Sequence, residues 1–161
     1  MPARPLEFGD YVTVLGEYLA EGGNPLHIPH LLTQWEASPV MGLPWMQKDV
    51  TGDGVAEITI SFVDPASELY PPISKMVIYG CREGSVASMY VFEPGEWFGL
   101  NFIGAQDLTL DGIAELVFSE VSCGAHTCWD ILHVWSWSGT DFEEKVGREF
   151  TTPYATYALE D

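Results

Sequence analysis

Two short acidic segments carry the residues of this chain that are best suited to chemistry. They read DVTGDGVAE, from Asp49 to Glu57, and DLTLDGIAE, from Asp107 to Glu115, and six of the nine positions are identical. Each segment places a carboxylate at every fourth position around a turn that contains glycine. Like charges held this close raise one another's pKa and repel, unless a cation lies among them. Oxygen ligands on such a turn suit a hard cation, above all Ca²⁺, so we expect a calcium loop at each segment.

The residues that follow each segment exclude an EF-hand. An EF-hand loop has a bidentate Glu at its twelfth position and continues into a helix. Here the twelfth positions are Ile60 and Phe118, whose side chains cannot ligate a metal. The runs ITISFV (58–63) and LVFSEV (116–121) are rich in β-branched and aromatic residues, which predicts strands. We therefore expect both loops to connect strands.

The two segments resemble the D-x-[DNT]-x-D-G-x-x-[DE] loops of FG-GAP/VCBS-type repeats, which occur in integrin α-subunit propellers and in bacterial extracellular proteins. The resemblance is specific at the loops, extends over residues 43–146, and is absent from the first forty residues. It implies one ion per loop, held by four side chains and one backbone carbonyl. The implied ligands are Asp49, Thr51, Asp53, the carbonyl of Val55 and Glu57 in the first loop, and Asp107, Thr109, Asp111, the carbonyl of Ile113 and Glu115 in the second.

A metal-free turn is the alternative. Asp-Gly pairs favour hairpins, and Asp or Thr side chains can accept hydrogen bonds from their own backbone. Thr at the third position departs from the commoner Asp or Asn of the family, and its neutral hydroxyl is a weaker Ca²⁺ ligand than a carboxylate. We therefore expect any calcium binding to be weak.

Charge and length limit the possible partners. The 161 residues, of which 47% are hydrophobic, are enough for one domain with a sizeable core. Six Lys and Arg stand against 24 Asp and Glu, so the net charge of −18 disfavours nucleic acid and anionic membranes as partners. No apolar run approaches the roughly 20 residues of a membrane span, so we expect no membrane insertion. The start, MPARPLEFGDY, lacks the apolar core of a signal peptide, which leaves a removed signal or a cytosolic protein. The resemblance favours an extracellular or cell-surface location.

The order of patterns predicts a mainly β fold (α+β) behind a short N-terminal helical segment, residues 1–40. Two helices are expected there, because apolar residues recur at helical spacing on either side of Gly22-Gly23 and Asn24-Pro25. The residues on their apolar faces are Phe8, Tyr11, Val12, Leu15, Tyr18, Leu19, Leu31, Leu32 and Trp35.

The remainder predicts two propeller-blade-like units of four antiparallel strands, 41–98 and 99–161. Turn residues at 83–85 and 138–140 mark equivalent hairpins in the two units. The expected strands lie near 43–48, 55–63, 74–80 and 86–93, and near 99–106, 113–121, 129–137 and 141–147. Asp161, at the end of the chain, is a hypothetical start of a third acidic loop, with an ordinary acidic tail as the alternative.

Cysteine and aromatic residues offer further candidate sites. Cys123 and Cys128 flank a short loop, which favours a disulfide in a secreted protein. The alternatives are free thiols or a zinc site that adds His126 and His133, although the spacing matches no common zinc pattern. Cys81 is expected to be buried in a strand.

An aromatic stripe could stack sugars. The residues that alternate onto one strand face are Trp129, Ile131, His133, Trp135 and Trp137, and Trp97 and Phe98 occupy a neighbouring segment. A core role is the alternative, because large aromatic side chains are mostly buried.

Three functions fit these patterns. The first is a non-catalytic, calcium-binding extracellular module for adhesion or for binding an unidentified protein or glycan. The second is a subunit of a surface fibre, in which exposed strand edges pair. The third is a hydrolase with an unrecognised site.

Overall fold

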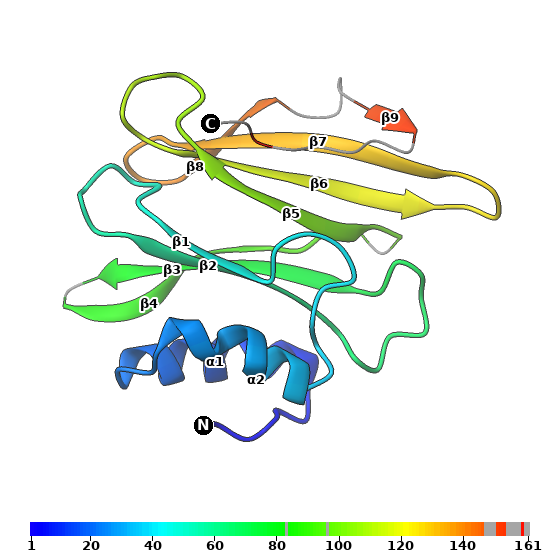
Figure 1. Ribbon diagram of the computed structural model, residues 1–161, viewed down its shortest axis with the longest axis horizontal. Helices are drawn as coiled ribbons and strands as arrows, with labels where there is room; N and C mark the ends of the chain where they lie inside the picture. Colours follow the sequence, from blue (N-terminus) through cyan, green and yellow to red (C-terminus); the bar gives the residue numbers. More distant parts are fainter. Residues whose placement is uncertain (83, 96, 147–150, 154–158, 160–161) are drawn as a thin grey trace.

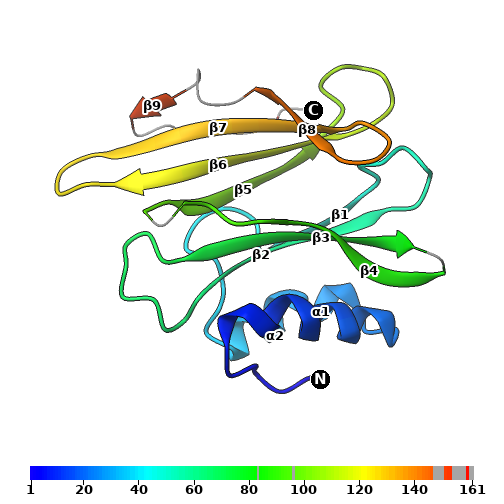
Figure 2. The same cartoon turned by 180° about the vertical axis from the view of Figure 1, so that it is seen from behind.

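Two antiparallel sheets stack face to face, and two helices cover the outer face of the first sheet (Figures 1 and 2). The computed structural model describes residues 1–82, 84–95, 97–146, 151–153 and 159, with only the backbone of 151–153. The fold is therefore mainly β with a short N-terminal helical segment, as the sequence predicts. None of the described helices is long and apolar enough to cross a membrane.

The helical segment consists of 3-10 turns that lead into two α-helices: η1 (Phe8–Asp10), α1 (Tyr11–Ala20), η2 (Pro25–His27) and α2 (Ile28–Gln34). Gly22 ends α1 at a positive φ of 84°, and the amides of Gly22 and Gly23 donate to the carbonyls of Leu19 and Tyr18. This is the Schellman arrangement, which satisfies the last carbonyls of a helix. The Asn24 side chain accepts a hydrogen bond from the Leu26 amide and so caps η2. The predicted breaks between the helices are confirmed.

Each sheet is an up-and-down meander. The first has the order β1 (Trp45–Lys48), β2 (Glu57–Val63), β3 (Ser74–Arg82), β4 (Ser85–Phe92). The second has the order β5 (Gly99–Gln106), β6 (Glu115–Cys123), β7 (Cys128–Trp137), β8 (Phe142–Val146), and β9 (Thr151–Pro153) also pairs with β7. The predicted strands form, although β2 and β6 begin at the last Glu of each acidic segment rather than two residues earlier. Strand β9 was not predicted.

The first sheet is covered on both faces, which explains its apolar central strands. Ile60, Phe62 and Val77 face the helices and pack with Tyr11 and Leu15 of α1. Met76 and Ile78, on the opposite face of β3, belong to the core between the two sheets. The Tyr79 hydroxyl donates to the Val12 carbonyl at 2.6 Å and ties α1 to β3. Strands buried on both faces read as near-continuous hydrophobic runs.

One expectation about burial is wrong. Cys81 is exposed, because it lies near the end of β3, beyond the buried stretch that ends at Gly80. His27 and His30 are exposed, and Nδ1 of His27 lies 3.4 Å from the Tyr18 hydroxyl. Asp161, the hypothetical start of a third loop, lies outside the described residues.

Candidate metal centre

The two acidic loops lie side by side at one end of the stacked sheets (Figures 1 and 2). The first joins β1 to β2, and the second joins β5 to β6, so each connects the first two strands of its sheet. The loops also touch: a Cβ atom added to Gly52 would lie 2.8 Å from Cγ1 of Ile113. Six carboxylates, three from each loop, are therefore gathered at this end of the molecule.

In the first loop, the aspartates accept hydrogen bonds from the loop's own amides. Oδ1 of Asp49 accepts from the amides of Thr51 (3.3 Å) and Gly52 (2.7 Å), and Oδ2 accepts from the amide of Gly54 (2.9 Å). Asp53 accepts from the Val55 amide at 2.7 Å. This bond engages the amide of Val55, whereas the predicted metal ligand is its carbonyl, so ligation by Val55 stays a prediction. Hydrogen bonds of this kind, from backbone amides to an Asp side chain, can close a tight turn without a bound ion.

Glu57 closes the loop from its buried end. Its side chain is only 3% exposed, and its oxygens accept from the Val50 amide (3.0 Å) and the Thr51 hydroxyl (3.3 Å). Burial raises the pKa of Glu57; the Val50 amide opposes this effect, and the negative charge of Asp53 adds to it. A buried carboxylate beside other acids favours the protonated form in this way. The Glu57 carboxylate thus joins the two ends of the loop.

The second loop repeats this arrangement. Glu115, 1% exposed, accepts from the Leu108 amide at 2.8 Å and from the Thr109 hydroxyl at 3.2 Å. Asp107 accepts from the amides of Asp111 (3.1 Å) and Gly112 (2.8 Å). The Ile113 amide donates to Asp111 at 2.9 Å, in the same way that Val55 donates to Asp53. Most of the closing hydrogen bonds therefore recur at equal positions, although Oδ1 of Asp49 accepts from Thr51 and Gly52 whereas Oδ1 of Asp107 accepts from Asp111.

The loops differ where the first has Gly52 and the second has Leu110. Both residues have a positive φ, 76° for Gly52 and 61° for Leu110. Glycine adopts this region freely, but a side chain with a Cβ does so at a cost. The Leu110 side chain is 89% exposed, so it gains little burial in return.

The donor chemistry of the loops fits a hard cation, whereas their described geometry does not form a cage. The side chains offer oxygen ligands only, three carboxylates and one hydroxyl in each loop, which is the set that Ca²⁺ prefers. In the described part of the chain, however, no three acidic, histidine or cysteine side chains converge closely enough to hold a metal ion. The carboxylates are turned toward backbone amides instead.

The candidate zinc site is wrong, because Cys123 and Cys128 form a disulfide across the β6–β7 hairpin. His133 lies on the inner face of β7, stacked on Phe118 with ring centroids 4.9 Å apart. Its Nδ1 contacts Glu144, and its Nε2 lies 3.4 Å from a Glu120 oxygen, an ion-pair distance. Neither glutamate was predicted to lie near His133, because the pairing of β6 with β7 brings Glu120 there and the pairing of β7 with β8 brings Glu144.

The predicted aromatic stripe divides into buried and exposed parts. Trp135 lies between the sheets and packs edge-to-face on Tyr90, with ring centroids 5.2 Å apart. Trp137 is partly buried against the same core. Trp129 and Trp97 are exposed. The core interpretation is thus confirmed for the middle of β7 and wrong for its start.

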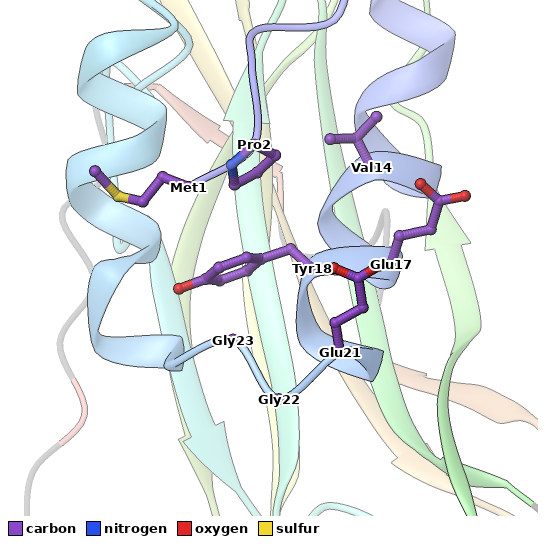
Figure 3. A pocket seen from close by; sticks show the side chains of 8 residues that line it. All are labelled: Met1, Pro2, Val14, Glu17, Tyr18, Glu21, Gly22 and Gly23. Atoms are coloured by element: carbon purple, nitrogen blue, oxygen red, sulfur yellow. The ribbon is translucent and has the colours of Figure 1, made fainter.

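A hollow of about 450 Å³ lies between the N-terminal residues and the C-terminal end of α1 (Figure 3). Its lining includes Glu17, Glu21 and the ring of Tyr18, but no serine, cysteine or histidine. The Tyr18 hydroxyl donates to the carbonyl of Asn24 at 3.1 Å. This lining offers acidic and aromatic groups without a nucleophile and its base, so it does not resemble an active site for acyl transfer.

Comparisons with protein-family models, with curated proteins and with solved structures found no match for this chain.

Proposed function

We propose that this protein is a non-catalytic, calcium-binding extracellular module with FG-GAP/VCBS-like repeats, which serves adhesion or ligand binding. One observation carries the proposal: two copies of one acidic pattern build closely similar turns, and the two turns adjoin at one end of the sheets. The Cys123–Cys128 disulfide supports an extracellular setting, because disulfides persist in oxidising compartments.

The negative charge at the end of the molecule that carries the two acidic loops explains why a cation would bind there. Six formal negative charges lie on two touching loops, in a chain whose net charge is −18. Backbone amides offset part of the repulsion, but they carry only partial charges. One Ca²⁺ in each loop would add four positive charges where the carboxylates are densest. Ligation requires some carboxylate oxygens to turn from their amide donors toward a shared ion, so the affinity should be modest, with a Kd on the order of 10⁻⁴ M.

Each loop joins the first two strands of a sheet, so bound calcium should stabilise both sheets. A ligand that binds only the folded state stabilises it by about 2.7 kcal/mol at a hundredfold excess over Kd. We expect isothermal titration calorimetry to detect Ca²⁺ binding and to detect weaker Mg²⁺ binding, because Mg²⁺ loses its water reluctantly. Millimolar Ca²⁺ should raise the melting temperature of the EDTA-treated protein.

Substitution of Asp by Asn tests metal binding while the hydrogen-bonded turn is kept. Asp53→Asn and Asp111→Asn keep a side-chain oxygen for the amides of Val55 and Ile113, but they remove one negative charge from each loop. The double variant should fold normally in EDTA and lose most of its Ca²⁺ response. Glu68→Gln, an exposed acid outside the loops, is the matched control and should respond like the parent protein. A protein that shows no heat of binding and melts identically in Ca²⁺ and EDTA would have metal-free turns, and the proposal would be wrong.

A further inference from the structure

Exposed aromatic side chains gather at the end of the molecule opposite the acidic loops. Tyr70 lies on the β2–β3 loop, Trp97 on the β4–β5 connection, and Trp129 near the start of β7. These three segments lie at the same end of the stacked sheets in both views (Figures 1 and 2). Trp97 is 68% exposed and Trp129 is 48% exposed. Large aromatic side chains left in water are typical of binding surfaces.

Contacts between the segments support this placement. A Cβ atom added to Gly99 would lie 2.3 Å from Cβ of Pro71, so the β2–β3 loop packs directly on the start of β5. Gly99 pairs with Val121 of β6, and the next residue of β6, Ser122, pairs with Trp129. The first sheet's loop and the second sheet's strands thus form one continuous surface.

A hollow of about 400 Å³ opens beside Trp97 in this surface. Small-molecule sites commonly have volumes of roughly 300–1,000 Å³ and combine apolar walls with a few polar groups. Leu69, Ile73, Phe98 and the Trp97 indole supply the apolar walls, and Lys75 and Glu93 supply the polar groups.

The polar groups are held in place. Nζ of Lys75 lies 2.7 Å from Oε1 of Glu93, and the Lys75 side chain is mostly buried. The same ammonium group lies 5.1 Å from the centre of the Phe8 ring, at cation–π distance. Glu93 remains more than half exposed, so its free oxygen can accept a hydrogen bond from a ligand.

We propose that this hollow binds a neutral sugar ring stacked on Trp97, and that the Lys75–Glu93 pair hydrogen-bonds its hydroxyls. A sugar ring has an apolar C–H face, which suits an exposed indole, and a rim of hydroxyls, which suits a charged pair. A wholly apolar ligand would desolvate that pair without replacing its hydrogen bonds to water, which is costly. An acidic glycan would be repelled by a chain of charge −18. A cationic ligand would face the Lys75 ammonium, which already neutralises Glu93.

A sugar in this hollow would be the ligand of the proposed binding module and so rests on that function, but the hollow does not include the calcium loops. The test uses the full chain, with intrinsic tryptophan fluorescence and calorimetry, in Ca²⁺ and in EDTA. The probes are the neutral hexasaccharides of β-1,4-glucose, β-1,3-glucose, mannose, xylose and N-acetylglucosamine, with a hexamer of galacturonic acid as the acidic comparator. We expect at least one neutral probe to bind and the acidic one not to bind.

Matched variants locate the binding. Trp97→Ala should weaken binding about tenfold or more, which corresponds to the loss of one good aromatic contact, whereas Trp97→Phe should keep most of the affinity. Glu93→Gln should weaken binding severalfold, since a neutral amide is a poorer acceptor. Trp129→Ala removes another exposed indole, one outside the hollow, and should leave the affinity within about twofold. Near-ultraviolet circular dichroism checks that every variant is folded.

Two results would overturn the sugar proposal. One is that no neutral hexasaccharide binds. This holds also if the apolar dye anilinonaphthalene sulfonate binds and Trp97→Ala abolishes that binding, because the hollow would then be an apolar site. The other is sugar binding that Trp97→Ala leaves unchanged. Neither result concerns Ca²⁺, because the titrations in EDTA and in Ca²⁺ report the metal response separately.

Discussion

Replacement of Leu110 by Gly should stabilise this protein, although the substitution deletes a hydrophobic side chain. Leu110 has a φ of 61°, in the left-handed region that residues with a Cβ disfavour. Its side chain is 89% exposed, so its removal sacrifices little buried surface. The equivalent residue of the first loop, Gly52, has a φ of 76°. The repeat itself therefore indicates which residue suits this backbone.

The size of the effect follows from two opposing terms. The left-handed conformation costs a residue with a Cβ about 1–2 kcal/mol. Glycine gives the unfolded chain extra freedom that favours unfolding by roughly 0.5–1 kcal/mol. The difference predicts a gain of about 0.5–1 kcal/mol in the free energy of unfolding for Leu110→Gly. In a domain of this size, 1 kcal/mol corresponds to about 2–4 °C, so the melting temperature should rise by about 1–4 °C.

Urea unfolding and differential scanning calorimetry in EDTA would measure this change without a contribution from bound cations. Gly52→Ala is the reciprocal control and should destabilise the protein, because its Cβ would meet Ile113 at 2.8 Å and its φ is positive. A Leu110→Gly variant that is less stable than the parent protein, at an unchanged urea m-value, would refute the argument from backbone strain.

Two further predictions concern titration and thiol chemistry. Burial lowers the pKa of His133, but the Glu120 and Glu144 carboxylates outweigh burial and raise the pKa above its ordinary value. The histidine therefore contributes stability that is complete below about pH 6.5 and is lost as the pH rises through the folded-state pKa. Urea unfolding from pH 5.5 to 9 should show that the free energy of unfolding of the parent protein falls relative to that of His133→Gln. Parallel curves for the two proteins would contradict this prediction. Alkylation without reductant should label Cys81 in the folded protein and spare the hairpin disulfide, and mass spectrometry showing three labelled cysteines would contradict the disulfide.

Much of the fold could be predicted from local sequence patterns. Alternating apolar residues and turn residues lie within short windows, so the eight strands of the two meanders were predicted to within a few residues. The Gly22-Gly23 helix end and the hairpins were predicted for the same reason. Strand β9 was missed, because its three residues carry no alternation of their own and its place depends on pairing with β7.

The acidic loops, too, were predictable from the sequence only in part. The nine-residue repeat determined that both loops would fold alike, because the hydrogen bonds that close each turn join residues at most seven apart. The contact between Gly52 and Ile113 was not predictable, because it depends on how the two sheets stack. Calcium ligation stays a prediction of the loop chemistry.

Burial was decided by the tertiary structure alone. Trp129 and Trp135 lie on the same face of one strand and have the same chemistry, but only Trp135 lies under the opposing sheet. Cys81 follows a buried run of β3 and is still exposed, because it lies near the end of its strand. The pairing of Lys75 with Glu93 likewise required two neighbouring strands to align. Sequence spacing sets which side of a strand a residue faces, whereas the packing of one sheet on another sets whether that side meets protein or water.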